Sequence, residues 1–104
     1  MTTLDRRENA LETEFAHQQE LKFRAREKAV KGLAVWAAGR MGKAGDALEA
    51  YAREVVAADV SSPEATIDRL AEALASKGIG KSEISQMMDR LLAAADAAMR
   101  TSQP

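Results

Sequence analysis

The chain has 104 residues with a formal net charge of −1 at pH 7, and 46% of them are hydrophobic. This length suits one small domain, and the absence of cysteine excludes a disulfide framework, a thiolate metal site and a thiol nucleophile. The longest apolar run, Leu33 to Ala38, is far shorter than the roughly 20 residues that a membrane-spanning helix needs, and the acidic first turns argue against a signal peptide, so we expect a cytoplasmic protein without direct membrane insertion.

Residues 1–31 have the pattern of a helix with little apolar surface of its own. Neither Gly nor Pro interrupts them, and 13 of the 31 are charged. In the first 19 residues the large apolar side chains beyond Met1 are Leu4, Leu11 and Phe15, whose spacing places them on one narrow stripe. Burying these three side chains would contribute roughly 5 to 9 kcal/mol, whereas ordering the backbone of about sixteen residues costs roughly 16 to 32 kcal/mol. We therefore expect this segment to be frayed or disordered when free and to fold on a partner.

An apolar face begins further along the same helix and marks the start of the core. The residues on this face, spaced three and four apart, are Val30, Leu33, Trp36, Ala37 and Met41. Three glycines within residues 39–45 then weaken the helix, and Asp46, followed three residues later by Glu49, has the spacing of a capping box. We expect a second helix to start there and to end near Asp59.

Two further helices are predicted from cap signals and periodicity. Ser62 as N-cap and Pro63 at the first helical position start the third helix. Gly78 is placed to end it in the left-handed conformation, with Ile79 folding back, and Ser82 is the expected N-cap of the fourth helix. The predicted buried faces of the last three helices are, in chain order, Leu48, Tyr51, Ala52 and Val55; Ile67, Leu70, Ala71 and Leu74; and Ile84, Met87, Met88, Leu91, Ala95 and Met99.

The predicted fold class is all-α, because no run of residues alternates in the way of a strand. Short loops place consecutive helices antiparallel, and four apolar stripes close most simply into a four-helix bundle. We expect residues 1–19 to be a long N-terminal arm that binds a partner and residues 20–104 to be the helical bundle domain. The protein is expected to be a monomer when free.

The chemistry-bearing residues do not assemble into a recognisable site. His17 is the single histidine, and neither a second histidine nor a cysteine is present to complete a metal site or a catalytic triad. Acidic residues such as Glu49, Asp59 and Glu72 have a spacing that is typical of solvated helix surfaces. We therefore predict no catalytic residue, no metal ligand, no cofactor and no enzyme activity.

The turn at residues 39–45, GRMGKAG, leaves a second interpretation open. A phosphate loop needs four residues between its glycines and a hydroxyl after the lysine, whereas this turn has two residues there and Ala44 after the lysine. Arg40, Gly42 and Lys43, at the start of a helix, could still hold a phosphate weakly, although a helix-to-helix turn is the simpler interpretation. The alternative function is thus a nucleotide- or phosphate-sensing regulatory helical bundle without catalysis.

Residues 22–31 form a basic stretch with a net charge of +4 that contains Phe23. Five cations on one helix, followed by an acidic body, make a poor nucleic-acid footprint, so no nucleic-acid partner is expected. A solvated helix face with Glu20 and Arg24 at four-residue spacing is the simpler interpretation. Docking on a membrane surface through this stretch and Trp36 is a third alternative.

Five short segments stand in a distinctive order, and they are MTTLD at residues 1–5, FAH at 15–17, KFRA at 22–25, GLAVWAA at 32–38 and YAREVVAAD at 51–59. Together they resemble the zeta subunit of the alphaproteobacterial F-type ATP synthase, over nearly the whole chain. Leu4 stands where that family commonly has an aromatic residue. Ala44 stands where it often has threonine, which removes a hydroxyl that a nucleotide site would use.

The resemblance implies a four-helix bundle that inhibits ATP hydrolysis by the catalytic head of the ATP synthase, as a peripheral partner of the inner-membrane enzyme. In the family the N-terminal segment enters the head as a helix, between an α and a β subunit beside the γ rotor shaft, and blocks rotation in the hydrolytic direction. The residues that would contact the partner are Leu4, Asp5, Arg6, Arg7, Glu8, Leu11, Glu12, Glu14 and Phe15. Phe15 is expected to contribute most, because buried aromatic side chains often dominate interfaces.

Overall fold

The computed structural model describes the backbone of residues 3–101 and the side chains of residues 14–100. Its elements, in chain order, are the α-helices and short 3-10 turns α1 (Thr3–Arg40), α2 (Gly45–Ser61), η1 (Pro63–Ala65), α3 (Thr66–Leu74), η2 (Ala75–Lys77) and α4 (Lys81–Thr101). No strand occurs in residues 3–101. The all-α class and the four-helix bundle predicted from the sequence are confirmed.

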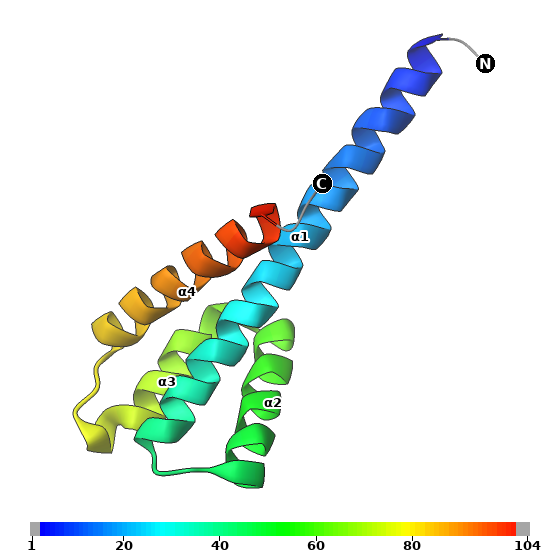
Figure 1. Cartoon of the computed structure of the whole chain (residues 1–104). Helices are drawn as coiled ribbons and strands as arrows, with labels where there is room; N and C mark the ends of the chain where they lie inside the picture. The colour runs from blue at the N-terminus through cyan, green and yellow to red at the C-terminus, as the bar shows by residue number, and fades with distance from the viewer. Residues whose placement is uncertain (1–2, 102–104) are drawn as a thin grey trace.

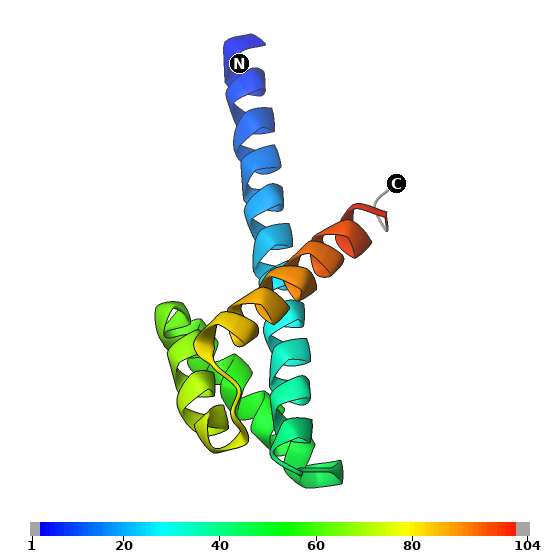
Figure 2. The ribbon, with the colours of Figure 1, turned by 90° about the vertical axis from the view of Figure 1, so that its left-hand side faces the viewer.

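Helix α1 is the longest element, and only its C-terminal half lies inside the bundle (Figure 1). That half packs against both α2 and α4, while the first turns of the helix project away from the other elements. Helix α2 runs back antiparallel to α1, and α4 crosses α1 at a marked angle (Figure 2). The molecule is therefore elongated, with principal extents of 62 × 25 × 23 Å.

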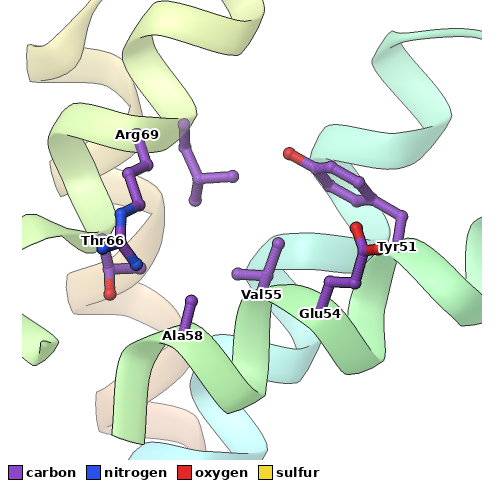
Figure 3. Close-up of a pocket in the computed structure, with 7 residues that line it drawn as sticks. Tyr51, Glu54, Val55, Ala58, Thr66 and Arg69 are labelled. Carbon is purple, nitrogen blue, oxygen red and sulfur yellow. The ribbon is translucent and has the colours of Figure 1, made fainter. Parts of the chain in front are cut away.

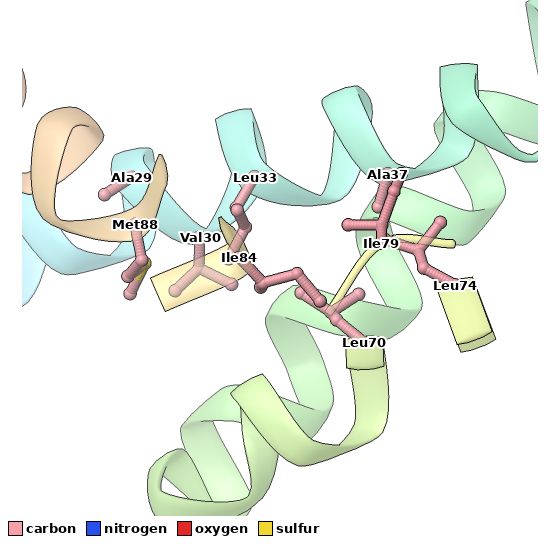
Figure 4. Close-up of a cluster of buried hydrophobic side chains, with 9 residues drawn as sticks. All are labelled: Ala29, Val30, Leu33, Ala37, Leu70, Leu74, Ile79, Ile84 and Met88. Carbon is pink, nitrogen blue, oxygen red and sulfur yellow. The ribbon is translucent and has the colours of Figure 1, made fainter. Parts of the chain in front are cut away.

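The core is one cluster of apolar side chains between α1, α3 and α4 (Figure 4). Its fully buried members, with 0–1% of their surface exposed, include Val30 and Leu33 of α1, Leu70 of α3 and Ile84 of α4. Trp36, Met41, Tyr51 and Val55 pack against this cluster while remaining half-buried, and are the outer members of the predicted faces. The apolar faces predicted for the four helices therefore meet in the core, except at Leu48 and Met99, which are half-buried outside this cluster.

The third helical segment ends at Gly78, the glycine that the sequence predicts as its C-terminal cap. Gly78 has φ = 73°, a left-handed conformation that a side chain would strain. The N–H of Ile79 donates back to the carbonyl oxygen of Leu74 at 3.4 Å, and the Ile79 side chain is buried in the core cluster. This is the fold-back contact expected of a helix C-terminal cap.

Two predicted helix starts were wrong by one or two residues. Helix α2 begins at Gly45, so Asp46 lies inside the first turn, and Ala44 occupies the N-cap position without a side-chain hydrogen bond. Helix α4 begins at Lys81, so Ser82 is already helical, and the N–H of Ile84 donates to the carbonyl oxygen of Gly80 at 3.2 Å. Acidic residues in these first turns act through the positive end of the helix dipole, which stabilises them there without capping geometry.

Ser62 precedes the turn η1 with Pro63 at its first position, as predicted, but the Ser62 side chain makes no cap hydrogen bond. The helix that follows is short, because Pro63–Ala65 is a 3-10 turn and α3 proper starts at Thr66. None of the described helices is both long and apolar enough to cross a membrane.

Candidate functional site

The projecting part of α1 presents its side chains to solvent wherever they are described. Residues 14–20 are all exposed, and Leu21 is the first side chain that the bundle partly covers. Glu14 and Phe15 are the two predicted partner-binding residues that fall in this part, and 64% of Phe15 is exposed. The side chains of the other predicted partner-binding residues lie outside the described set, namely Leu4, Asp5, Arg6, Arg7, Glu8, Leu11 and Glu12.

A predicted ion pair lies on this exposed helix, between Glu20 and Arg24. The Arg24 Nη2 donates to the Glu20 Oε1 at 2.6 Å, and more than half of each side chain is exposed. An exposed pair at this spacing stabilises a helix by about 0.3–0.5 kcal/mol. The pair therefore makes only a small contribution to the stability of the helix in this segment.

Where α1 enters the bundle, a buried carboxylate joins three elements. Asp59, in the last turn of α2, is 5% exposed. Arg26 of α1 donates from Nε to one Asp59 carboxylate oxygen at 3.1 Å and from Nη2 to the other at 2.8 Å. Thr66, at the start of α3, donates its hydroxyl to Asp59 at 2.6 Å, and Arg26 also donates to the carbonyl oxygen of Pro63 at 3.2 Å. This network fixes α2, η1 and α3 to α1 just below the exposed segment.

The partners of Asp59 outweigh the effect of its burial. Burial alone raises the pKa of the Asp59 carboxyl, but the hydrogen bonds from Arg26 and Thr66 and the charge of Arg26 lower it more, so its pKa lies below the usual value of 3.8. The hydrogen bonds that Arg26 donates to Asp59, together with the charge of that carboxylate, raise the pKa of the Arg26 guanidinium despite partial burial. Both groups are therefore held in their charged forms.

The interpretation of Asp59 as a surface residue was wrong. Its partners are 33 and seven residues away in the sequence, so helical spacing gives no sign of them. One sequence signal was available. A carboxylate in the last turn of a helix faces the negative end of the helix dipole, which disfavours it unless a cation compensates.

Replacing Asp59 with asparagine is expected to destabilise the bundle by about 1–3 kcal/mol at pH 7, because it removes a charge-assisted pair of hydrogen bonds at a buried position. Since the folded pKa of Asp59 is depressed, its contribution is present above the unfolded value of 3.8 and is lost as the pH falls through the folded value. Urea unfolding of wild type and Asp59→Asn at pH 7 and pH 3 should therefore show a smaller difference at pH 3.

The matched control is Asp68→Asn. Asp68 pairs with Lys81 on the surface, with 63% and 66% of the two side chains exposed. Its loss should cost no more than about 1 kcal/mol. Equal effects of the two substitutions at pH 7 would contradict the special role of Asp59.

The turn between α1 and α2 carries the residues of the phosphate hypothesis. Gly42 has φ = 83° there, which a turn of this shape requires. The guanidinium of Arg40 lies over the Trp36 ring, 5.8 Å from its centroid, and the ammonium of Lys43 lies 5.7 Å from the centroid of Tyr51. Each cation thus stacks on a different ring and stabilises the turn. Phosphate binding by Arg40, Gly42 and Lys43 stays a prediction.

An apolar hollow of about 200 Å³ lies between α2 and α3 (Figure 3). Its walls are Tyr51, Val55, Ala58 and Leu70, with charged side chains at its rim. Burial and the neighbouring Glu54 raise the pKa of the Tyr51 hydroxyl. The hydroxyl of Thr66, which also borders the hollow, is already engaged by Asp59. The hollow could therefore accommodate an apolar group, but its lining residues do not form an acid–base pair for catalysis.

Comparison with known protein families adds a match over almost the whole chain. The model of the family described as ATPase inhibitor subunit zeta matches residues 1–98. Comparison with curated proteins and with solved structures gives no match. The family match covers both the projecting segment and the bundle.

Proposed function

The chain belongs to the family of ATPase inhibitor subunit zeta, and from that premise we propose that its N-terminal arm, residues 1–19, inhibits ATP hydrolysis by entering the catalytic head of the F-type ATP synthase as a helix. The arm lies between an α and a β subunit, beside the γ rotor shaft, and blocks rotation in the hydrolytic direction. The bundle, residues 20–104, stays outside. The protein acts as a cytoplasmic monomer that associates peripherally with the membrane-bound enzyme.

The observation that carries this proposal is the exposure of Phe15 on a helix that extends beyond the bundle. A large aromatic side chain that is 64% exposed has most of its apolar surface available to a partner. Burying it would contribute about 1.5–3 kcal/mol. Glu14 and the other charged residues of the arm can pair with polar groups around such an anchor.

The dimensions of the molecule support the same arrangement. Helix α1 has 38 residues, which corresponds to a length of about 57 Å. A single helix with its side chains is about 10–12 Å across, whereas the two shorter extents of the molecule are 25 and 23 Å. A cleft that admits the arm therefore excludes the bundle, which stops insertion where α1 becomes covered by other helices.

Replacing Phe15 with alanine is expected to weaken inhibition by about ten- to a hundredfold, since truncation of a central aromatic anchor typically costs 2 kcal/mol or more. The measurement is ATP hydrolysis by the isolated catalytic head at increasing concentrations of the protein. The matched control is Gln19→Ala, an exposed polar position on the same helix, which should change the inhibition constant by about twofold or less. Equal inhibition by Phe15→Ala and wild type would contradict the assigned role of Phe15.

A further inference from the structure

Two large apolar side chains of the bundle remain exposed, and they lie beside each other. Phe23 of α1 and Val60 of α2 are each 57% exposed. Together with Val56 of α2 and Pro63 of η1 they line a mostly apolar hollow of about 130 Å³. We call these four residues the shoulder patch.

The shoulder patch differs from the scattered apolar residues that any protein surface carries. Among the described residues, the large hydrophobic side chains that stay well exposed are Phe15, Phe23 and Val60. The first lies on the projecting segment of α1, and the other two meet in one hollow at the end of the bundle nearest that segment. Clustered exposed apolar surface of this kind marks interaction sites.

The position of the shoulder patch follows from the direction of the helices. Because α2 runs antiparallel to α1, its C-terminal turn, which carries Val60, points toward the projecting segment (Figures 1 and 2). Phe23 follows Phe15 by eight residues on the same continuous helix, or about 12 Å along its axis. Around the axis Phe23 is turned from Phe15 by about 80°. A partner that encloses the helix at Phe15 therefore comes within about 12 Å of the level of the shoulder patch.

Hydrogen bonds of Arg26 hold together the elements that line the shoulder patch. Arg26, which also lines the hollow, is held by both oxygens of Asp59 and donates to the carbonyl oxygen of Pro63. The positions of α2 and η1 relative to α1 are thus set before any partner arrives, which lowers the entropy lost on binding. Arg26 and Glu27 give the apolar hollow a polar border, the arrangement found at protein interfaces.

We propose that the shoulder patch is a second docking surface for the same partner that receives the arm, and that its hollow takes an apolar side chain from the outer rim of the cleft in the catalytic head. The inference rests on the proposed function and adds to it a contact made by the bundle itself. Insertion of the arm ends when the rim meets the shoulder patch. This contact fixes the depth to which the arm enters and slows its release.

The test compares Val60→Lys with Ala50→Lys in the full-length protein. Both substitutions place a lysine on the exposed surface of α2, but Ala50 lies about 15 Å further along the helix from the shoulder patch. Val60→Lys should weaken inhibition of the catalytic head about tenfold, mainly through faster dissociation, with an unchanged midpoint of thermal unfolding. Ala50→Lys should behave as wild type. Phe23→Ala, which introduces no charge, should weaken inhibition in the same direction.

Equal inhibition by wild type, Val60→Lys and Phe23→Ala would overturn the inference while leaving the proposed function intact. Failure of the wild-type protein to inhibit or bind the catalytic head would instead refute the proposed function. A wild-type dimer that Val60→Lys converts to a monomer would also overturn the inference, because the shoulder patch would then join two copies of the chain.

A second measurement locates the contact directly. The chain contains no cysteine, so Val60→Cys provides a single thiol for a photoactivatable cross-linker. Irradiation of the inhibited complex should join this position to a subunit of the catalytic head, whereas Ala50→Cys should give no such product. Cross-linking from Ala50→Cys alone would place the contact elsewhere and overturn the inference.

Discussion

A chain that begins at Glu20 is expected to lose inhibition of ATP hydrolysis completely while keeping a folded bundle. The described side chains of the removed segment, from Glu14 onward, make no part of the core, and the core cluster starts at Ala29. Removal therefore costs the bundle little free energy. It removes the segment that the proposal places inside the catalytic head, and with it the physical block to rotation.

Two measurements check this prediction on the intact and shortened chains together. Titration of each into ATP hydrolysis by the isolated catalytic head gives the inhibition, and circular dichroism with thermal unfolding shows whether the bundle remains helical and cooperative. Equal inhibition by both chains would move the inhibitory site into the bundle. No inhibition by either would contradict the proposed function itself.

Replacing Leu33 with alanine is expected to destabilise the bundle by about 2–5 kcal/mol, the range found for fully buried leucines. Leu33 has 0% of its surface exposed, at the centre of the cluster that joins α1 to α3 and α4. A domain of this size is stable by only about 5–15 kcal/mol in total. This single truncation therefore removes a large fraction of the stability, and urea unfolding at pH 7 measures it.

Leu92→Ala is the matched control, because Leu92 has the same side chain but is only partly buried against the same cluster. Its loss should cost about half as much or less. The Leu33→Ala protein should still inhibit ATP hydrolysis as strongly as wild type under conditions where it remains folded, because this substitution leaves the arm unchanged. A cost below about 1 kcal/mol would contradict the assignment of Leu33 to the centre of the core.

Periodicity was enough to predict the helices and their inward faces. Leu33, Leu70 and Ile84 recur at helical spacing among polar residues, so their segments had only one face to bury. Gly78 was equally readable, because a glycine after the last periodic residue is the usual C-terminal cap. These signals depend only on residues that are close together in the chain, so they can be recognised in a single sequence.

The contacts that could not be predicted depend on how the helices pack. The cations of residues 22–31, which include Arg26, and the carboxylate of Asp59 were interpreted as solvated charges. Only the antiparallel pairing of α1 with α2 brings Arg26 and Asp59 within hydrogen-bond distance. The same pairing places Val60 beside Phe23, which the sequence showed merely as an aromatic residue in a basic stretch. The side chains from Leu4 to Glu12 lie outside the described residues, so their predicted partner contacts stay predictions.

Because α1 is one continuous helix, the packing of its C-terminal half in the bundle fixes the direction in which side chains of the arm point. Phe15 and Leu33 are 18 residues apart on one helix without a proline, which corresponds to about five full turns. Phe15 therefore lies on the same side of α1 as the leucine at the centre of the core. The direction in which Phe15 projects is therefore set by how Leu33 is buried. In the proposed complex, the arm would reach the cleft of the catalytic head with this orientation already fixed.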